Sequence, residues 1–141
     1  AQNYLAAYLN VRQLSFGLTD MAWHTITEPF EGDVEQFEVA SMAPSQVQPV
    51  VPGTAMAPAF GHIFSGGYAA GYYGYKWAEV LEADAFSLFK EKGIFNREVS
   101  GSFRENILSK GGTEHPMELY VRFRGHKPET KALIEKMGLG K

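Results

Sequence analysis

The chain has 141 residues, the size of an ordinary single domain, and is long enough to bury most of the surface that its unfolded state exposes. Apolar residues make up 45% and charged residues 21%, a globular composition that excludes disorder as the general state. The net charge of −3 is small and the 13 Lys and Arg form no basic stripe, which argues against a nucleic-acid partner. The sequence contains no cysteine, which excludes disulfides and thiolate metal ligands.

Residues 1–43 are predicted to be helical. Apolar residues recur at three- and four-residue steps from residue 3 to about residue 27, which predicts an amphipathic helix that ends near Pro29. Asp33, with Gln36 three positions later, is expected to cap a second helix that runs to Met42. The chain does not begin with methionine, and no convincing cap precedes its first helical pattern. We therefore expect that it is cut from a longer protein.

Residues 44–65 are predicted to form an ordered, extended loop that is rich in proline. The only strand candidate in the sequence is residues 46–51, and its prolines weaken that interpretation. No Asp, Glu, Lys or Arg occurs from residue 39 to residue 75. A transmembrane span over residues 55–75 would have a suitable length, but Pro58, clustered glycines and the lack of a Leu-, Ile- and Val-rich run argue against it. We expect this stretch to line the interior or a cleft of a larger body.

Residues 66–92 are predicted to hold a loop rich in glycine and tyrosine and a long helix from about Tyr68 to Lys92. The buried side of that helix is expected to carry Trp77, Val80, Leu81, Ala85, Phe86 and Phe89. Residues 93–141 are predicted to form C-terminal helices, bounded by Gly93, Asn96, Gly111, Thr113 or Glu114, Gly125, Pro128 and Gly138. The predicted fold class is all-α.

The residues that could carry chemistry lie between positions 61 and 75. If this stretch is helical from Tyr68, then Tyr68, Tyr72 and Tyr75 form a row of phenols on one face. A phenol can donate a hydrogen bond to a developing oxyanion, which is worth about 3 kcal/mol of transition-state stabilisation, and His62 could donate similarly. Neighbouring glycines would let the backbone approach a ligand and move between open and closed forms; they are Gly66, Gly67, Gly71 and Gly74.

Two other interpretations of this stretch are open. The small residues could allow tight helix packing, with the tyrosines filling a core. A phosphate-binding loop at Gly66 and Gly67 is disfavoured, because no Lys, Ser or Thr is placed as in the nucleotide-binding loops.

Several runs of this sequence resemble the thimet oligopeptidase family of zinc metallopeptidases, and within it the bacterial peptidyl-dipeptidase and oligopeptidase A branches. They are His-Ile-Phe-Ser-Gly-Gly-Tyr-Ala-Ala-Gly-Tyr-Tyr at 62–73 with Tyr75, Trp-Ala-Glu-Val-Leu at 77–81, Asp-Ala-Phe at 84–86, Ile-Leu-Ser-Lys-Gly-Gly at 107–112 and Arg-Phe-Arg-Gly-His-Lys-Pro at 122–128. The resemblance covers most of the chain. It implies the C-terminal helical part of a two-lobed peptidase with a deep substrate channel.

The resemblance also implies roles for individual residues. Tyr75 would stabilise the oxyanion on the scissile carbonyl, while Tyr68 and His62 would bind the substrate backbone or assist at the same carbonyl. The glycine-rich loop from Gly66 to Gly74 would adapt around peptides of differing sequence, and Tyr72 would belong to the channel wall.

Zinc in this family is bound by a His-Glu-x-x-His helix and a further glutamate, and the sequence contains no such motif. Its histidines are His24, His62, His115 and His126. Zinc is therefore expected in the full-length parent, with ligands upstream of this chain, and none is expected in the chain itself. His24 is expected to pack or cap, and the acidic residues Glu79, Glu82 and Asp84 to be solvated or salt-bridged.

The resemblance implies a parent that hydrolyses short peptides, and it leaves open whether that parent releases C-terminal dipeptides or acts as an oligopeptidase. This chain is expected to be inactive alone. The alternatives are a peptide-binding module without chemistry and a helical module that self-associates through an exposed apolar face. No membrane partner is expected. The lack of cysteine is compatible with the bacterial cytoplasm, which is the expected location, and a periplasmic or exported parent is an open alternative.

Overall fold

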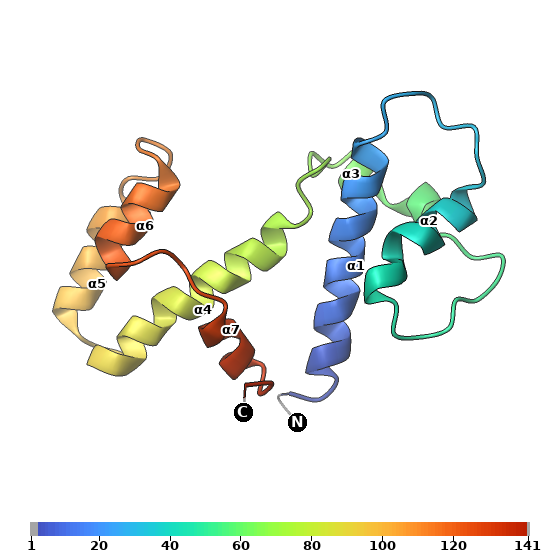
Figure 1. Cartoon of the computed structure of the whole chain (residues 1–141). Helices are drawn as coiled ribbons and strands as arrows, with labels where there is room; N and C mark the ends of the chain where they lie inside the picture. Colours follow the sequence, from blue (N-terminus) through green and yellow to red (C-terminus); the bar gives the residue numbers. More distant parts are fainter. Residues whose placement is uncertain (1–2, 141) are drawn as a thin grey trace. The chain divides into compact units, whose positions relative to one another are not determined.

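The computed structural model describes residues 3–140, and within that range it contains helices and connecting segments but no strand (Figure 1). The predicted all-α class is confirmed. The chain divides into two compact units, Ala1–Trp77 and Ala78–Lys141.

In the first unit, helix α1 (Ala6–His24) packs against helix α2 (Val34–Met42) (Figure 1). The Asp33 side chain accepts the backbone N–H of Gln36 at 2.8 Å, so the predicted cap of α2 is confirmed. Helix α1 ends at His24, before the predicted end near Pro29.

The segment after α2 is irregular, as predicted, but it contains three short helical turns: η1 (Ala43–Ser45), η2 (Ala57–Ala59) and α3 (Gly61–Phe64). The prediction that the long helix begins at Tyr68 is wrong, because α4 (Gly74–Lys92) begins at Gly74. Gly67 and Ala70 have φ angles of 80° and 52°. Such left-handed residues cannot continue a right-handed helix, so Tyr68 is not helical and residues 69–73 form turns instead.

Helix α1 has an unusual distribution of side chains, because its buried residues are polar or small. They are Ser15, Gly17, Thr19 and Asp20. Its leucine face, by contrast, is exposed in this chain at Leu14 and Leu18, and Met21 is exposed beside them. The predicted amphipathic period is therefore present, but the apolar side is not the side that α1 buries here.

The second unit contains the rest of α4 together with α5 (Arg97–Phe103), the π-helix η3 (Arg104–Leu108), α6 (Pro116–Arg124) and α7 (Lys131–Lys136). Its main core is formed by Ala85, Val99, Tyr120 and Phe123. The predicted Asn96 cap of α5 is confirmed, and so are the stops at Gly93 and Gly125, which have φ angles of 106° and 87°.

The start of α6 was predicted one or two residues early, and that of α7 is wrong. Helix α6 has Pro116 in its first turn, as predicted, and His115 caps it by accepting the N–H of Met117 at its Nδ1, where Thr113 or Glu114 was expected. Helix α7 begins at Lys131 and not at Pro128.

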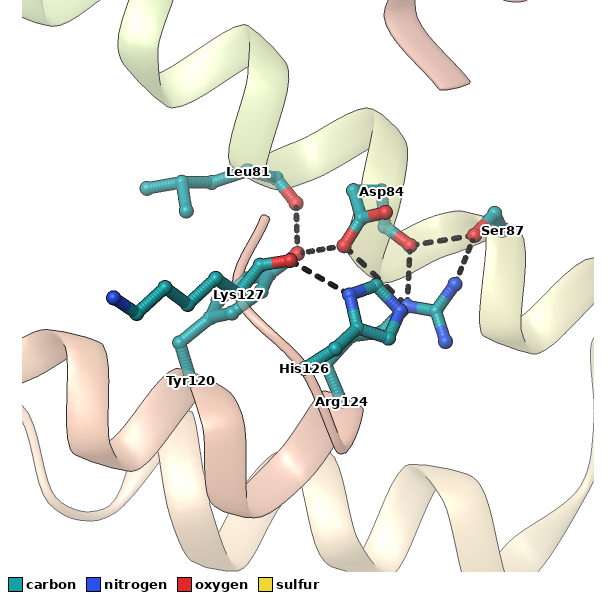
Figure 2. A network of polar contacts seen from close by, with 7 residues as sticks. All are labelled: Leu81, Asp84, Ser87, Tyr120, Arg124, His126 and Lys127. Atoms are coloured by element: carbon teal, nitrogen blue, oxygen red, sulfur yellow. Dashed lines mark hydrogen bonds and ion pairs between the residues drawn. The ribbon is translucent and has the colours of Figure 1, made fainter. Parts of the chain in front are cut away.

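The buried side of α4 is confirmed at Val80 and Ala85, whereas Trp77 and Phe86 are exposed. Asp84 is buried, and its carboxylate accepts the Tyr120 hydroxyl at 2.5 Å and lies 3.4 Å from Nε of Arg124 (Figure 2). Asp84 is thus salt-bridged, as expected, but it lies in the core, where it joins α4 to α6. Glu82 pairs with Lys136 at 2.6 Å.

Candidate functional site

The four aromatic side chains His62, Tyr68, Tyr72 and Tyr75 lie against one another, and we call them the phenol cluster. The Tyr68 and Tyr75 rings stack, with centroids 5.0 Å apart and an angle of 21° between their planes. The His62 ring lies 5.8 Å from Tyr68 and 6.4 Å from Tyr75, and Tyr72 lies 5.2 Å from Tyr75. The structure therefore brings together all three residues that the sequence singled out as catalytic.

The phenol cluster is not built as the sequence suggested. His62 comes from α3, Tyr68 and Tyr72 come from the turns before α4, and Tyr75 lies in the first turn of α4. The predicted row of phenols along one helical face is wrong, because residues 68–73 are not helical. The turns bring the rings together instead.

Tyr72 differs from the other members of the cluster in its burial. Its ring packs edge-on against Phe16 and Phe60, at centroid distances of 5.7 Å and 5.3 Å. Its hydroxyl donates to Oε1 of Gln13 at 3.1 Å. Tyr68 and Tyr75, which are 40% and 39% exposed, are the phenols that a ligand could reach.

The environment of Tyr75 favours the protonated form of its hydroxyl further. A side-chain hydrogen bond with Tyr68 raises the pKa of Tyr75 above its ordinary value of 10.0, and partial desolvation and the nearby phenols act in the same direction. At neutral pH Tyr75 is therefore a neutral phenol, which can donate a hydrogen bond.

The glycines of this loop have different structural requirements. Gly67 has a φ of +80°, a conformation that strains any other residue. A Cβ on Gly66 would lie 3.0 Å from Cα of His62, so only glycine fits there without a backbone shift. Gly71 and Gly74 have ordinary or open surroundings, and their identity is not required by the local geometry.

Two buried carboxylates bind residues 39–75, which contain no Asp, Glu, Lys or Arg and which we call the charge-free stretch. Sequence reasoning missed both carboxylates. Asp20 of α1 is 0% exposed and accepts the backbone N–H groups of Ala70 at 2.9 Å and Tyr72 at 2.8 Å. Glu38 of α2 is 8% exposed and accepts those of Met56 at 2.8 Å and Ala57 at 2.6 Å. Most residues of this stretch are exposed in this chain, and only Ala57, Ile63 and Tyr72 are buried. The two carboxylates provide acceptors from outside the stretch for backbone donors at or beside the buried Ala57 and Tyr72.

The only sequence feature that could have indicated these two carboxylates was the charge-free stretch that they bind. A long segment without charged side chains needs polar partners from other elements wherever its backbone donors are buried. The spacing of the sequence does not indicate which carboxylates provide them, because Asp20 and Ala70 are 50 positions apart.

The described part of the chain does not fit a zinc ion. Within residues 3–140, no group of three or more His, Cys, Asp or Glu could hold a metal. His24 packs as expected: its Nδ1 lies 2.8 Å from the Asp20 carbonyl and 2.9 Å from the Asp20 carboxylate, and its ring lies against Phe64. Among these same residues, no helix is long and apolar enough to cross a membrane.

Comparison with known proteins identifies the family. The model of "Peptidase family M3" matches residues 1–139. Oligopeptidase A of Escherichia coli strain K12 is 49% identical over 99% of this chain, and oligopeptidase A of Salmonella typhimurium is 50% identical over the same share. Dipeptidyl carboxypeptidase of E. coli is 39% identical over 89% of the chain. The chain spans only 21% of the length of the two oligopeptidases and 19% of the carboxypeptidase. Because the family model covers almost all of the sequence, the chain belongs to peptidase family M3.

Proposed function

We propose that this chain forms the substrate-binding and oxyanion-stabilising part of a zinc peptidase that hydrolyses short peptides. The observation that carries this proposal is the phenol cluster, in which two half-exposed phenols stack beside His62. Membership of peptidase family M3 supports the reaction class. The names of the relatives support the substrate class, since they are oligopeptidases and dipeptidyl carboxypeptidases.

Hydrolysis of a peptide bond places negative charge on the carbonyl oxygen as a water molecule adds to the carbon. Tyr75 would donate a hydrogen bond to that oxygen, while Tyr68 and His62 would donate to the same carbonyl or to the substrate backbone. Donors that are already in place need no reorganisation during the reaction, and one of them is typically worth about 10²- to 10³-fold in kcat. The Tyr68 ring, which stacks on Tyr75, would help to position the Tyr75 ring before substrate binds.

The glycine loop completes the proposed binding surface. Gly66, Gly67, Gly71 and Gly74 would let the backbone approach an extended peptide, and buried Tyr72 would form part of the wall. The zinc ligands would lie in the part of the parent that this chain does not cover.

Within this function, release of C-terminal dipeptides is the narrower specificity, and it rests on the similarity to dipeptidyl carboxypeptidase. A cytoplasmic parent is supported by the similarity to a protein named "Probable cytosolic oligopeptidase A" from Arabidopsis thaliana, which is 40% identical. Digests of peptides of defined length separate the two specificities, since a dipeptidyl carboxypeptidase releases dipeptides successively from a free C-terminus.

The test is the Tyr75→Phe variant of the full-length parent. We expect kcat to fall by about 10²- to 10³-fold with a small change in KM, because the lost hydrogen bond forms mainly in the transition state. Tyr73→Phe is the matched control, since Tyr73 is 59% exposed and lies beside the cluster in sequence. Equal activity of the Tyr75→Phe and Tyr73→Phe proteins would remove Tyr75 from the mechanism.

A second candidate is a module that self-associates or binds peptides without chemistry. It is favoured by the exposed apolar face of α1, formed by Leu14, Leu18 and Met21. Sedimentation of the isolated chain tests this candidate. A dimer that Leu18→Glu converts to a monomer would support it, and a monomer at all concentrations would exclude self-association.

A further inference from the structure

We infer that Asp20 is a positioning residue for the phenol cluster: its buried carboxylate holds the turn of residues 70–72 and thereby sets where the reactive phenols lie. This inference rests on the proposed function and extends it to a residue of α1 whose side chain is fully buried. Asp20 is 0% exposed, so its role is mediated entirely by the groups that it contacts.

The Asp20 carboxylate accepts two hydrogen bonds from the turn of residues 70–72. Oδ1 accepts the N–H of Ala70 at 2.9 Å, and Oδ2 accepts the N–H of Tyr72 at 2.8 Å. One rigid side chain therefore fixes two alternate amides of the same turn. Hydrogen bonds to an ionised acceptor are stronger than those between neutral groups. The two hydrogen bonds that Asp20 accepts, which we call the clasp, therefore hold the turn more strongly than backbone hydrogen bonds of a turn would.

The turn needs such support because its backbone is strained. Ala70 has a φ of 52°, in the left-handed region, which is unfavourable for a residue that has a Cβ. Strained residues of this kind persist only where the surrounding structure over-determines them, and they cluster at functional sites. The Ala70 N–H is one of the two groups that Asp20 binds, so the clasp acts at the strained residue itself.

His24 completes the environment of the carboxylate. Its Nδ1 lies 2.9 Å from Oδ1 of Asp20 and 2.8 Å from the Asp20 carbonyl. Both oxygens are acceptors, so Nδ1 must carry a hydrogen. Asp20 thus receives donors from His24, Ala70 and Tyr72, and an asparagine could not accept from all of them, because its amide nitrogen is a donor.

The turn is directly coupled to the phenol cluster. Tyr72 contributes both the amide that Asp20 binds and a ring that lies 5.2 Å from Tyr75. Tyr68 lies two residues before Ala70 and stacks on Tyr75. A change in the path of residues 70–72 would therefore displace both neighbours of the proposed oxyanion donor. Misplacement by about 1 Å costs on the order of 10²-fold in rate.

The experiment uses the full-length parent with its zinc content measured, and compares Asp20→Asn with Glu38→Gln. Both changes neutralise a buried carboxylate that binds two backbone amides of the charge-free stretch. Only Asp20, however, binds the turn of residues 70–72, which carries Tyr72 of the phenol cluster. We expect Asp20→Asn to lower kcat about 10- to 100-fold with a much smaller change in KM, and Glu38→Gln to leave kcat of the folded protein unchanged.

A rescue variant separates positioning from general stability. Ala70→Gly relieves the left-handed strain, so the Asp20→Asn/Ala70→Gly protein should recover part of the lost kcat. Amide hydrogen exchange gives a readout that does not depend on activity. It should accelerate over residues 68–73 in Asp20→Asn and should stay at the wild-type rate there in Glu38→Gln.

Equal losses of kcat in the two carboxylate variants, or unchanged amide exchange over residues 68–73 in Asp20→Asn, would overturn the positioning role of Asp20. If Tyr75→Phe keeps full activity, the proposed function fails, while the exchange data still report whether Asp20 holds the turn. Rescue by Ala70→Gly together with local exchange in Asp20→Asn supports the inference.

Discussion

Tyr68 and Tyr75 stack at a centroid distance of 5.0 Å although one belongs to a turn and the other to the first turn of α4. Their hydrogen bond is the largest of the effects that raise the pKa of Tyr75. The contact therefore influences both the position and the protonation of the proposed oxyanion donor.

Replacing Tyr68 by phenylalanine should lower the pKa of Tyr75 toward its ordinary value of 10.0. Tyr75 donates only while it is protonated, so the alkaline fall of kcat/KM in the full-length parent should move to lower pH. The pH profile of kcat/KM measures this shift. Tyr73→Phe is the control, because Tyr73 is not among the groups that shift the pKa of Tyr75. Superimposable profiles for the Tyr68→Phe and wild-type proteins would contradict the prediction.

The glycines of the loop should respond to alanine in a graded order. Gly67→Ala meets open space but must adopt a φ of +80°, which costs about 1–2 kcal/mol. Gly66→Ala should cost more, because its Cβ would lie 3.0 Å from Cα of His62 and 3.1 Å from two carbonyl oxygens. Gly74→Ala begins α4 in open space and should stabilise the protein by up to about 1 kcal/mol.

Urea unfolding of the three glycine variants measures this order. The same variants test the proposed loop movement, since Gly67→Ala should also raise KM for peptides by hampering adaptation of the loop. An unchanged KM and kcat for Gly67→Ala would show that the loop does not need this freedom. A Gly66→Ala protein as stable as wild type would show that the His62 backbone can shift at little cost.

Tyr120→Phe should destabilise the second unit by about 1.5–3 kcal/mol at neutral pH, because it removes a hydrogen bond to the buried Asp84 carboxylate (Figure 2). Asp84→Ala should lower the free energy of unfolding further, by about 3–5 kcal/mol, since it removes the carboxylate that lies 3.4 Å from Nε of Arg124. Urea unfolding at neutral pH measures both changes. Equal stabilities of the two variants would contradict this account of the network.

Tyr120 should also make stability fall at alkaline pH. Desolvation and then the hydrogen bond to Asp84 raise the pKa of Tyr120 above its ordinary value of 10.0. The folded state therefore holds this proton more tightly than the unfolded state. Its contribution is complete below about pH 10, and it is lost at about 1.4 kcal/mol per pH unit as the pH rises further toward the folded pKa. The difference in stability between wild type and Tyr120→Phe should shrink over that range.

The isolated 141-residue chain should not cleave peptides, even with added zinc, because its described residues offer no group of metal ligands. An assay with short quenched-fluorescence peptides, run beside the full-length parent, measures this. Activity in the parent alone, abolished by a chelator, is the expected result. Zinc-dependent cleavage by the pure chain would place the metal centre within these residues and overturn the proposal.

Local signals in the sequence were sufficient for several helix boundaries. Asp33 and Asn96 accept the backbone N–H groups that their capping patterns predicted, and Gly93 and Gly125 end their helices. These features depend on residues within one or two helical turns, so a sequence contains nearly all the information that they need. The start of α4 was misplaced because Ala70 adopts a left-handed φ of 52°, which no local pattern of an alanine predicts.

The residues of the phenol cluster could be named from the sequence, and their assembly could not. Tyr68, Tyr72 and Tyr75 were expected on one helical face, but they meet through turns that are held by Asp20, 52 positions before Tyr72. The burial of Asp20, Glu38 and Asp84 was likewise decided by tertiary structure. From sequence alone, a charged side chain is predicted to be exposed to solvent, because charged residues are rarely buried without partners. Its burial depends on hydrogen-bond donors that only the folded chain brings close to it.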